Sequence, residues 1–109
     1  MHDIERIIDS AWERRAELLP DSPDLEVRAA VDAALDLLEC GTRRVAEPSP
    51  DGGWRVNQWL KKAVLLYFRI NANRVMAGGP AQAWDKVPLR FGNADAEEFA
   101  GLGARVVPG

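Results

Sequence analysis

A fourteen-residue stretch near the middle of the chain, residues 57–70, constrains the fold more than any other part of the sequence. Nine of these residues are apolar, and their spacing is that of a helix that is apolar around most of its circumference. The residues at helical spacing are Trp59, Ala63, Leu66 and Ile70, widened by Leu60, Val64 and Tyr67. Because exposed apolar surface is unfavourable in water, such a helix is normally covered by other elements. The stretch therefore predicts a central buried helix around which a small domain packs.

An amphipathic helix is predicted at the beginning of the chain. Ile4, Ile8 and Trp12 lie on one face of it, and charged residues cover the other face. The pattern continues to Leu19, and Pro20 is expected to end the helix because proline cannot continue it.

A second helix is predicted directly after this proline. Ser22 is a suitable N-cap and Pro23 suits the first helical position, and an apolar stripe then runs from Val27 to Leu38. Gly41 supplies the stop signal. Because the connection between the two helices is so short, we expect them to pack as an antiparallel pair.

A β-hairpin is predicted between the second helix and the central helix. Residues 43–47 and 54–56 have strand character, and the segment 48–53 between them is rich in turn-forming residues. We expect Val45 and either Trp54 or Val56 to pack on the hydrophobic core.

The last third of the chain contains shorter signals. A brief strand is expected at residues 74–77, a short helix at residues 96–100 capped by Asn93 or Asp95, and strand-like backbone at residues 104–107. Between this strand and the short helix, Trp84, Val87, Leu89 and Phe91 are expected to be the apolar anchors. The predicted fold class is α+β and mostly helical: an antiparallel helix pair, a central buried helix, a short late helix, a small hairpin and short strands.

Composition excludes several classes of function. A net charge of −3 over 109 residues argues against nucleic-acid binding. Cys40 is the only cysteine, so no internal disulfide can form, and its place at the end of an apolar helix pattern predicts a buried, inert thiol. The only histidine is His2, so no zinc site and no histidine-dependent catalytic set is expected. From the residues alone, we predict no catalytic residue, no cofactor-binding residue and no metal ligand.

No membrane association is expected from the sequence. The longest uninterrupted apolar run, residues 63–68, is far shorter than a membrane span, and no signal peptide is recognisable at the N-terminus. A cytoplasmic location is therefore expected.

Several stretches, taken together and in order, carry a family resemblance. They are Ile7-Ile8 followed by residues 12–17, residues 44–47, residues 58–66 followed by 68–71, residues 85–88 and residues 105–108. The chain resembles the N-terminal domain of tetrahydrodipicolinate N-succinyltransferase, a family of bacterial lysine and diaminopimelate biosynthesis. The most specific of these stretches is the one within the central helix.

The resemblance implies a larger protein. It implies that residues 1–109 are a single N-terminal domain, and that a left-handed β-helix of hexapeptide repeats, absent from this chain, follows residue 109. That domain would trimerise and bind succinyl-CoA as co-substrate. The implied reaction moves the succinyl group to the amino nitrogen of ring-opened tetrahydrodipicolinate, and the implied catalytic acids lie outside these 109 residues.

One substrate-binding residue is implied by the same resemblance. The arginine of the family's Arg-Val-Val-Pro stretch binds the dicarboxylate substrate, and here it is Arg105. A guanidinium group offers a planar fork of donors that suits a carboxylate and stays charged at any working pH. The alternative is a solvated arginine on an edge strand.

Two classes of function therefore remain open at the level of sequence. The chain is either the N-terminal domain of a succinyltransferase, inactive alone because the CoA site lies elsewhere, or a stand-alone, non-enzymatic helical domain that binds a protein partner. Hexapeptide repeats after residue 109 would favour the first class, and a stop codon there would favour the second.

Overall fold

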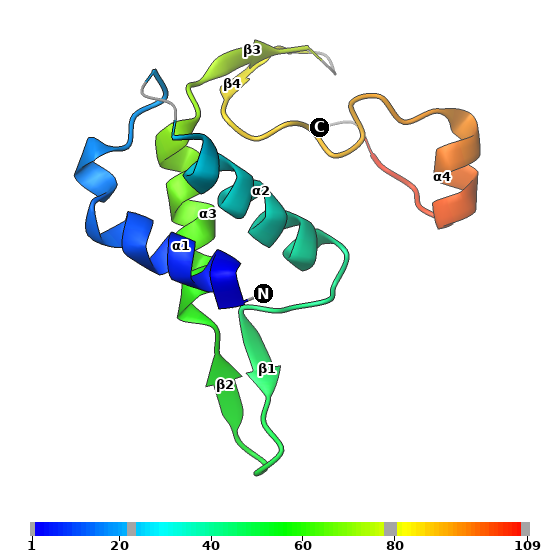
Figure 1. Ribbon diagram of the computed structural model, residues 1–109. Helices are drawn as coiled ribbons and strands as arrows, with labels where there is room; N and C mark the ends of the chain where they lie inside the picture. Colours follow the sequence, from blue (N-terminus) through cyan, green and yellow to red (C-terminus); the bar gives the residue numbers. More distant parts are fainter. Residues whose placement is uncertain (1, 22–23, 78–80, 108–109) are drawn as a thin grey trace. The chain divides into compact units, whose positions relative to one another are not determined.

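The computed structural model of the chain describes residues 2–21, 24–77 and 81–107. It comprises two compact units, Met1–Asn71 and Ala72–Gly109, each with its own secondary structure. Helices predominate and the strands are short, so the prediction of a mostly helical α+β fold is confirmed (Figure 1).

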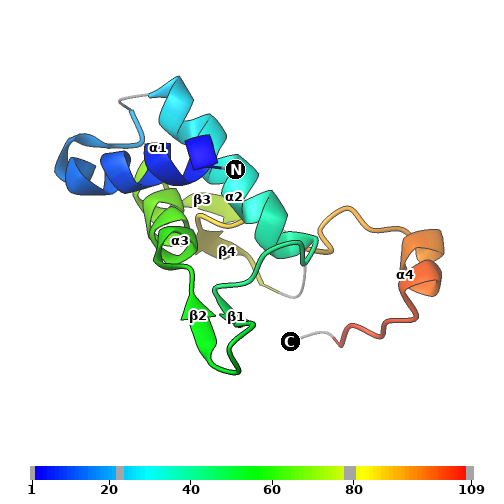
Figure 2. The same ribbon diagram turned by 60° about the horizontal axis from the view of Figure 1, so that its bottom comes forward.

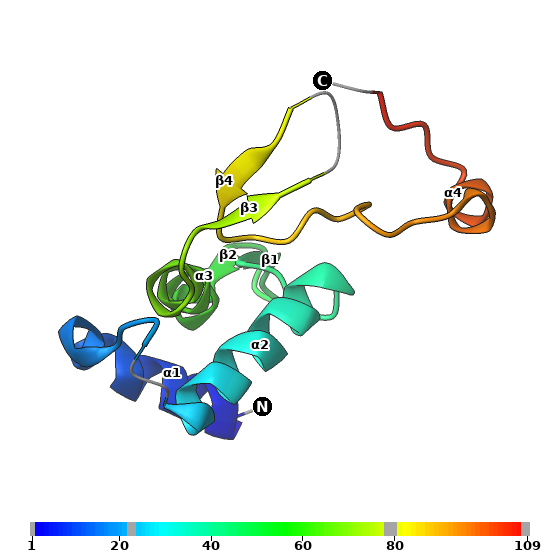
Figure 3. The same ribbon diagram turned by 90° about the horizontal axis from the view of Figure 1, so that it is seen from above.

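Three helices and a hairpin form the first unit. In chain order its elements are α1 (His2–Glu13), the 3-10 helix η1 (Arg15–Glu17), α2 (Leu25–Glu39), β1 (Ala46–Pro48), β2 (Trp54–Val56) and α3 (Gln58–Ile70). The three α-helices pack against one another in every pairwise combination. Helices α1 and α2 run in broadly opposite directions in Figure 1, and Figure 3 shows both of them on the same side of α3.

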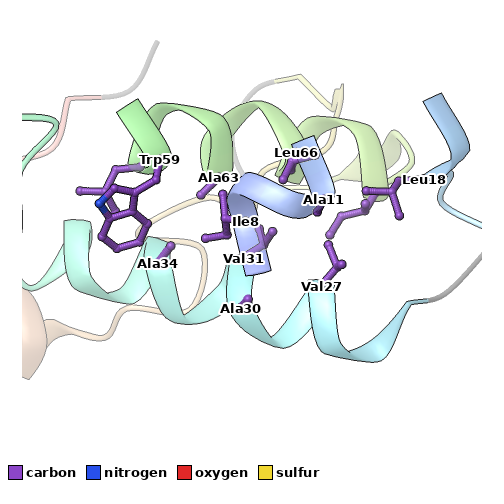
Figure 4. Packing of buried hydrophobic residues seen from close by; sticks show 12 residues of the cluster. Ile8, Ala11, Leu18, Val27, Ala30, Val31, Ala34, Trp59, Ala63 and Leu66 are labelled. Carbon is purple, nitrogen blue, oxygen red and sulfur yellow. The ribbon is translucent and has the colours of Figure 1, made fainter. Parts of the chain in front are cut away.

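The core of this unit is built on α3, as the spacing of its apolar residues predicts. Ile8 of α1 and Val31 of α2 are fully buried beside Leu66 of α3 (Figure 4). Leu60 of α3 is fully buried in the same cluster. The remaining core residues are Ala11, Leu18, Val27, Ala30, Ala34, Trp59, Ala63 and Ile70. Small alanines alternate with larger side chains, which lets the helices approach closely. The central buried helix is therefore confirmed, with all four residues of its predicted stripe in the core.

The first helix ends earlier than predicted. It stops at Glu13 instead of continuing to Leu19, and a 3-10 turn follows. The Arg15 guanidinium donates a hydrogen bond of 2.7 Å to the carbonyl of Trp12 and lies 4.2 Å from the centre of the Trp12 ring. This arginine pairs a carbonyl that the end of the helix leaves without a partner, and the turn brings Leu18 into the core.

The second helix begins at a different cap from the one predicted. The N-cap of α2 is Asp24, whose Oδ1 accepts a hydrogen bond of 3.2 Å from the backbone N–H of Val27. Ser22, the predicted N-cap, and Pro23, the predicted first helical residue, lie outside the described residues. Gly41 follows the helix in the left-handed conformation at φ 76°, as its role as a stop signal requires.

The prediction of a buried thiol is wrong. Cys40 is the C-cap of α2 and is exposed, and its Sγ donates a hydrogen bond of 2.8 Å to the carbonyl of Asp36. The last fully buried residue of α2 is Ala34, and burial falls off along the rest of the helix, so the thiol at its end lies outside the core.

The hairpin forms, but its apolar side chains do not reach the core. Strands β1 and β2 are antiparallel, with Ala46 opposite Val56 and Pro48 opposite Trp54. The prediction that Val45 packs on the core with Trp54 or Val56 is wrong, because these residues are 37%, 71% and 53% exposed. The hairpin extends away from the packed helices (Figures 1 and 2), and a polar residue described below attaches it to them.

The second unit is sparsely packed. Strands β3 (Arg74–Met76) and β4 (Ala83–Asp85) form an antiparallel pair, and α4 (Ala96–Leu102) follows. Three of the predicted anchors, Trp84, Val87 and Leu89, are exposed, and residues 104–107 form no strand. A segment of this length contains too few apolar residues to enclose a core of its own, which explains why these predictions failed.

The core of the first unit generates a prediction about stability. We expect Leu66→Ala to lower the free energy of unfolding by about 3 kcal/mol, because it opens a cavity in the centre of the helix packing. The matched control is Leu65→Ala, one position earlier on α3, where the side chain is 40% exposed and the loss should stay below about 1 kcal/mol. Urea unfolding of both variants measures the difference, and equal losses would contradict the assignment of the buried face.

Candidate functional site

The end of the second unit contains Arg105, the residue that the family resemblance implies for substrate binding. Asp95 is the N-cap of α4, and its Oδ1 accepts a hydrogen bond of 2.9 Å from the backbone N–H of Glu98. The rings of Phe91 and Phe99 lie 5.4 Å apart, so the turn before the helix packs on the helix itself. The choice of Asp95 settles which of the two predicted caps is used.

A left-handed glycine ends this helix. Gly103 has φ 64° and donates its backbone N–H to the carbonyl of Ala100, and Ala104 donates to the carbonyl of Phe99 over 3.4 Å. This pair of hydrogen bonds turns the chain away from the helix axis immediately before Arg105. The position of Arg105 relative to α4 therefore depends on a conformation that glycine adopts readily and other residues adopt at a cost.

The guanidinium group of Arg105 has no bonding partner among the described residues. Arg105 is exposed, as are Val106 and Val107 after it, and no hydrogen bond or ion pair within the described part of the chain involves its side chain. An arginine in this state retains its full set of donors for an external carboxylate.

A cluster of paired charged groups lies elsewhere, at the base of the hairpin. Both carboxylate oxygens of Glu47 are paired: Oε2 accepts from Arg55 at 2.8 Å, and Oε1 accepts from the side chain of Arg43 at 3.2 Å and from the backbone of Arg44 at 3.0 Å. The hydrogen bonds from Arg55 and from the backbone of Arg44 lower the pKa of Glu47 to about 2. Both oxygens of this carboxylate are therefore occupied by groups of the first unit itself.

Asn57 connects the same cluster to α3. It is buried, its Nδ2 donates to the carbonyl of Arg44 at 2.6 Å, and its Oδ1 accepts from the guanidinium of Arg43 at 3.2 Å. This cluster was not predicted from the sequence. The available signals were the four-residue spacing of Arg43 and Glu47 and an asparagine directly before a helix.

No metal site is visible in the described ranges. Among residues 2–21, 24–77 and 81–107, no group of three or more histidine, cysteine, aspartate or glutamate side chains could hold an ion. Within the same ranges, no helix has the length and apolarity needed to cross a membrane.

Comparison with known proteins shows which family the chain belongs to. The domain family described as "Tetrahydrodipicolinate N-succinyltransferase N-terminal" matches residues 3–70, which is nearly all of the first unit. The chain belongs to this family. The resemblance noted in the sequence is thereby confirmed.

Individual relatives extend the similarity over the second unit. The chain is 57% identical over 105 residues to the 2,3,4,5-tetrahydropyridine-2,6-dicarboxylate N-succinyltransferase of Methylococcus capsulatus, which covers 96% of this chain and 38% of that protein. The proteins of the same name from Aeromonas hydrophila and Burkholderia mallei are 52% and 55% identical, over 99% and 96% of this chain and 39% and 38% of theirs. The chain thus spans about two fifths of the length of the curated relatives that it matches.

The two glycines at the end of α4 generate a prediction: substitution of each by alanine should change the stability of the helix in opposite directions. We expect Gly103→Ala to destabilise α4 by about 1 kcal/mol, because alanine at a positive φ is strained. Gly101→Ala is the matched control: Gly101 lies inside the helix with open space around it, so alanine there should stabilise α4 by about 1 kcal/mol. Amide hydrogen exchange of residues 99–102 should therefore become faster in the first variant and slower in the second. A change of the same sign in both would contradict the cap.

The hairpin cluster generates a prediction about pH. Because the pKa of Glu47 is about 2 in the folded chain and has its ordinary value of 4.5 when unfolded, its ionised form stabilises the fold above pH 4.5. That contribution is lost as the pH falls from 4.5 through 2. We expect the difference in unfolding free energy between wild type and Glu47→Gln to be largest near pH 6 and to shrink toward pH 2.

The control for this prediction is Glu13→Gln, at an exposed position on α1. Urea titrations at several pH values measure both differences. The pKa values of Asp24 and Asp51 are also lowered, by hydrogen bonds from Arg14 and from the backbone of Gly53, so wild type alone would not isolate Glu47. A wild-type to Glu47→Gln difference that stays constant with pH would contradict the assigned pairing.

Proposed function

We propose that this chain is the N-terminal domain of an enzyme that transfers a succinyl group from succinyl-CoA to the amino nitrogen of ring-opened tetrahydrodipicolinate. In this reaction the amine attacks the thioester carbonyl, an amide bond forms, the carbon–sulfur bond breaks, and CoA leaves as the thiol after taking up the proton that the amine releases. The proposal covers the complete polypeptide, of which these 109 residues would be one part.

The observation that carries this proposal is the extent of the similarity. Relatives that are 52–57% identical share one name, and the similarity runs through both units of the chain, from α1 to the residues around Arg105. Similarity confined to the helical packing of the first unit would support only a shared fold.

The proposed role of Arg105 is to bind one carboxylate of the substrate. Three features support it: the side chain is exposed, no described residue pairs with it, and the resemblance implies that this arginine corresponds to the family's substrate-binding arginine. A guanidinium can hold a carboxylate through two parallel hydrogen bonds, which fixes the orientation of the substrate as well as its position. Arg105 would then act in binding and positioning and not in proton transfer.

The proposed partner of the second unit is the remainder of the same polypeptide. Val75, Trp84 and Leu102 are 57%, 66% and 59% exposed, which is unusual for large apolar side chains in such number. Burial of these residues against a further domain would complete the packing that this unit lacks. In the proposal that domain is a hexapeptide-repeat β-helix, which binds succinyl-CoA and forms a homotrimer in the cytoplasm.

The exposed apolar residues would also fit the alternative function, a stand-alone domain that binds another protein. The two functions differ in one measurement, which is succinyl transfer by the complete polypeptide that the gene encodes. Formation of the N-succinylated product supports the enzyme, and its absence from a folded, full-length preparation would reject it. The 109 residues alone should give no product in the same assay.

The proposal generates a prediction for Arg105. We expect Arg105→Ala in the full-length enzyme to lower kcat/KM for the amino-dicarboxylate by about 10-fold to 100-fold, mainly through KM, because a charge-assisted hydrogen bond contributes about 1.5–3 kcal/mol. The KM for succinyl-CoA should change little. Arg105→Lys should recover part of the loss, because it restores the charge without the planar fork.

The matched control is Arg74→Ala, which removes another exposed arginine of the second unit. It should leave both Michaelis constants within about twofold of wild type, since surface substitutions of this kind rarely have larger effects. An unchanged KM for the amino-dicarboxylate in Arg105→Ala would exclude the substrate-binding role, while an active enzyme would leave the proposed reaction intact.

A further inference from the structure

The β1–β2 hairpin has one face made only of apolar side chains. Ala46 lies opposite Val56 and Pro48 lies opposite Trp54, and these four residues alternate with the polar residues of the two strands. Side chains two residues apart on a strand point to the same face, so the four share one side of the ribbon. All four are exposed, Trp54 at 71%.

The opposite face accounts for the stability of the hairpin. Glu47 lies opposite Arg55 on that side and pairs with it at 2.8 Å, and Arg43 and Asn57 connect the pair to the rest of the unit. A two-stranded hairpin is marginal in water without such support. The apolar face is exposed and none of its four residues belongs to the core cluster, so its surface is available for another purpose.

An exposed tryptophan on such a face is unfavourable in a free domain. Large aromatic side chains are among the residues that most strongly favour burial, and a contiguous apolar patch commonly marks an interaction surface. No charged side chain interrupts the four residues, so the occupant must present an apolar surface and not an acidic or basic one. This excludes a phosphate-rich partner for this face.

The relatives indicate where such an occupant would come from. The hairpin lies inside the stretch matched by the family, residues 3–70, while the chain spans only 38–40% of the length of its relatives. About three fifths of each relative's length is therefore outside the structure. A segment of the same polypeptide has a high effective concentration, so a small apolar face suffices to dock it.

We propose that the apolar face of the β1–β2 hairpin is an interdomain docking surface, covered in the full-length protein by the polypeptide that follows residue 109. The inference rests on the proposed function, because it requires the chain to continue as the relatives do. It assigns to the hairpin a role distinct from that of Arg105, which is to fix the first unit on the remainder of the protein.

Thiol labelling tests the proposal. In a Cys40→Ser background, single cysteines are placed on the apolar face by Val56→Cys and, independently, by Ala46→Cys, and the control is Ala29→Cys on the exposed side of α2. All three side chains are exposed in the 109-residue chain, so all three thiols should react with a small aromatic disulfide at similar rates. In the full-length protein, the two hairpin cysteines should react at least tenfold more slowly, with the control within about twofold.

Three results would overturn the proposal. The first is equal reactivity of the hairpin cysteines in the two lengths of protein. The second is protection already present in the 109-residue chain and lost on dilution, which would identify a second copy as the occupant. The third is protection in the 109-residue chain at every concentration, which would show that another part of these 109 residues covers the hairpin face.

A succinyl-transfer assay of the same full-length samples distinguishes failure of the docking surface from failure of the proposed function. Activity without protection of the hairpin would overturn the docking surface alone. Protection without activity would support the docking surface and count against the proposed reaction.

Discussion

The amide of Asn57 lies buried between the hairpin and α3 with all of its polar atoms paired. Its side chain bonds to Arg43 and to the carbonyl of Arg44, its backbone N–H donates to Val45 at 2.7 Å, and its carbonyl accepts from Leu60 at 3.0 Å. A side-chain amide both donates and accepts, so an apolar residue at this position would lose both of these part-buried hydrogen bonds. A hydrogen bond of this kind contributes about 0.5–1.5 kcal/mol, which matters in a domain whose whole stability is about 5–15 kcal/mol. The direction in which the hairpin leaves the helices therefore depends on this residue.

Arginines perform a related task at the helix ends. Arg28 of α2 donates to the carbonyl of Ile70 at 2.8 Å and to the side chain of Asn71 at 3.3 Å, where α3 ends. Arg69 donates to the carbonyls of Arg15 and Ala16 after α1. The last carbonyls of a helix carry a partial negative charge and lack partners within the helix, so a guanidinium suits them. These arginines of the first unit are occupied by the fold itself, which sets Arg105 apart from them.

The residues that were predicted correctly share a physical property. The stripe of α3, the glycine after α2 and the cap at Asp95 are encoded by spacing or by local chemistry within a few residues, and such signals act wherever the segment lies. Trp84, and either Trp54 or Val56, were predicted to be anchored by packing, but both tryptophans are exposed. The prediction failed because the apolar character of a residue indicates that burial is favourable but not which surface buries it. The Glu47 cluster was missed for a related reason, since it joins a loop, two strands and a helix start that only the folded chain brings together.

The candidate site was accessible to sequence reasoning only through the family. Arg105 is one of 14 lysines and arginines, and nothing in its spacing distinguishes it from a solvated surface residue. The structure adds that its guanidinium is exposed and without a described partner, which is compatible with substrate binding but is also true of ordinary surface arginines. Only the resemblance to the family's Arg-Val-Val-Pro stretch distinguishes Arg105 from the other exposed arginines of the chain.

The exposure of Arg105 also bears on why the complete polypeptide would be required. An ion pair between an exposed arginine and a carboxylate in water contributes only about 0–1 kcal/mol, because both groups exchange strong hydration for a weak interaction. That corresponds to no useful affinity for a small dicarboxylate. The same pair becomes stronger when surrounding protein excludes water and lowers the local dielectric constant. The proposed role of Arg105 therefore needs a second surface to close over the substrate, and the apolar side chains around it, Leu102, Val106 and Val107, are of the kind that such a surface would cover.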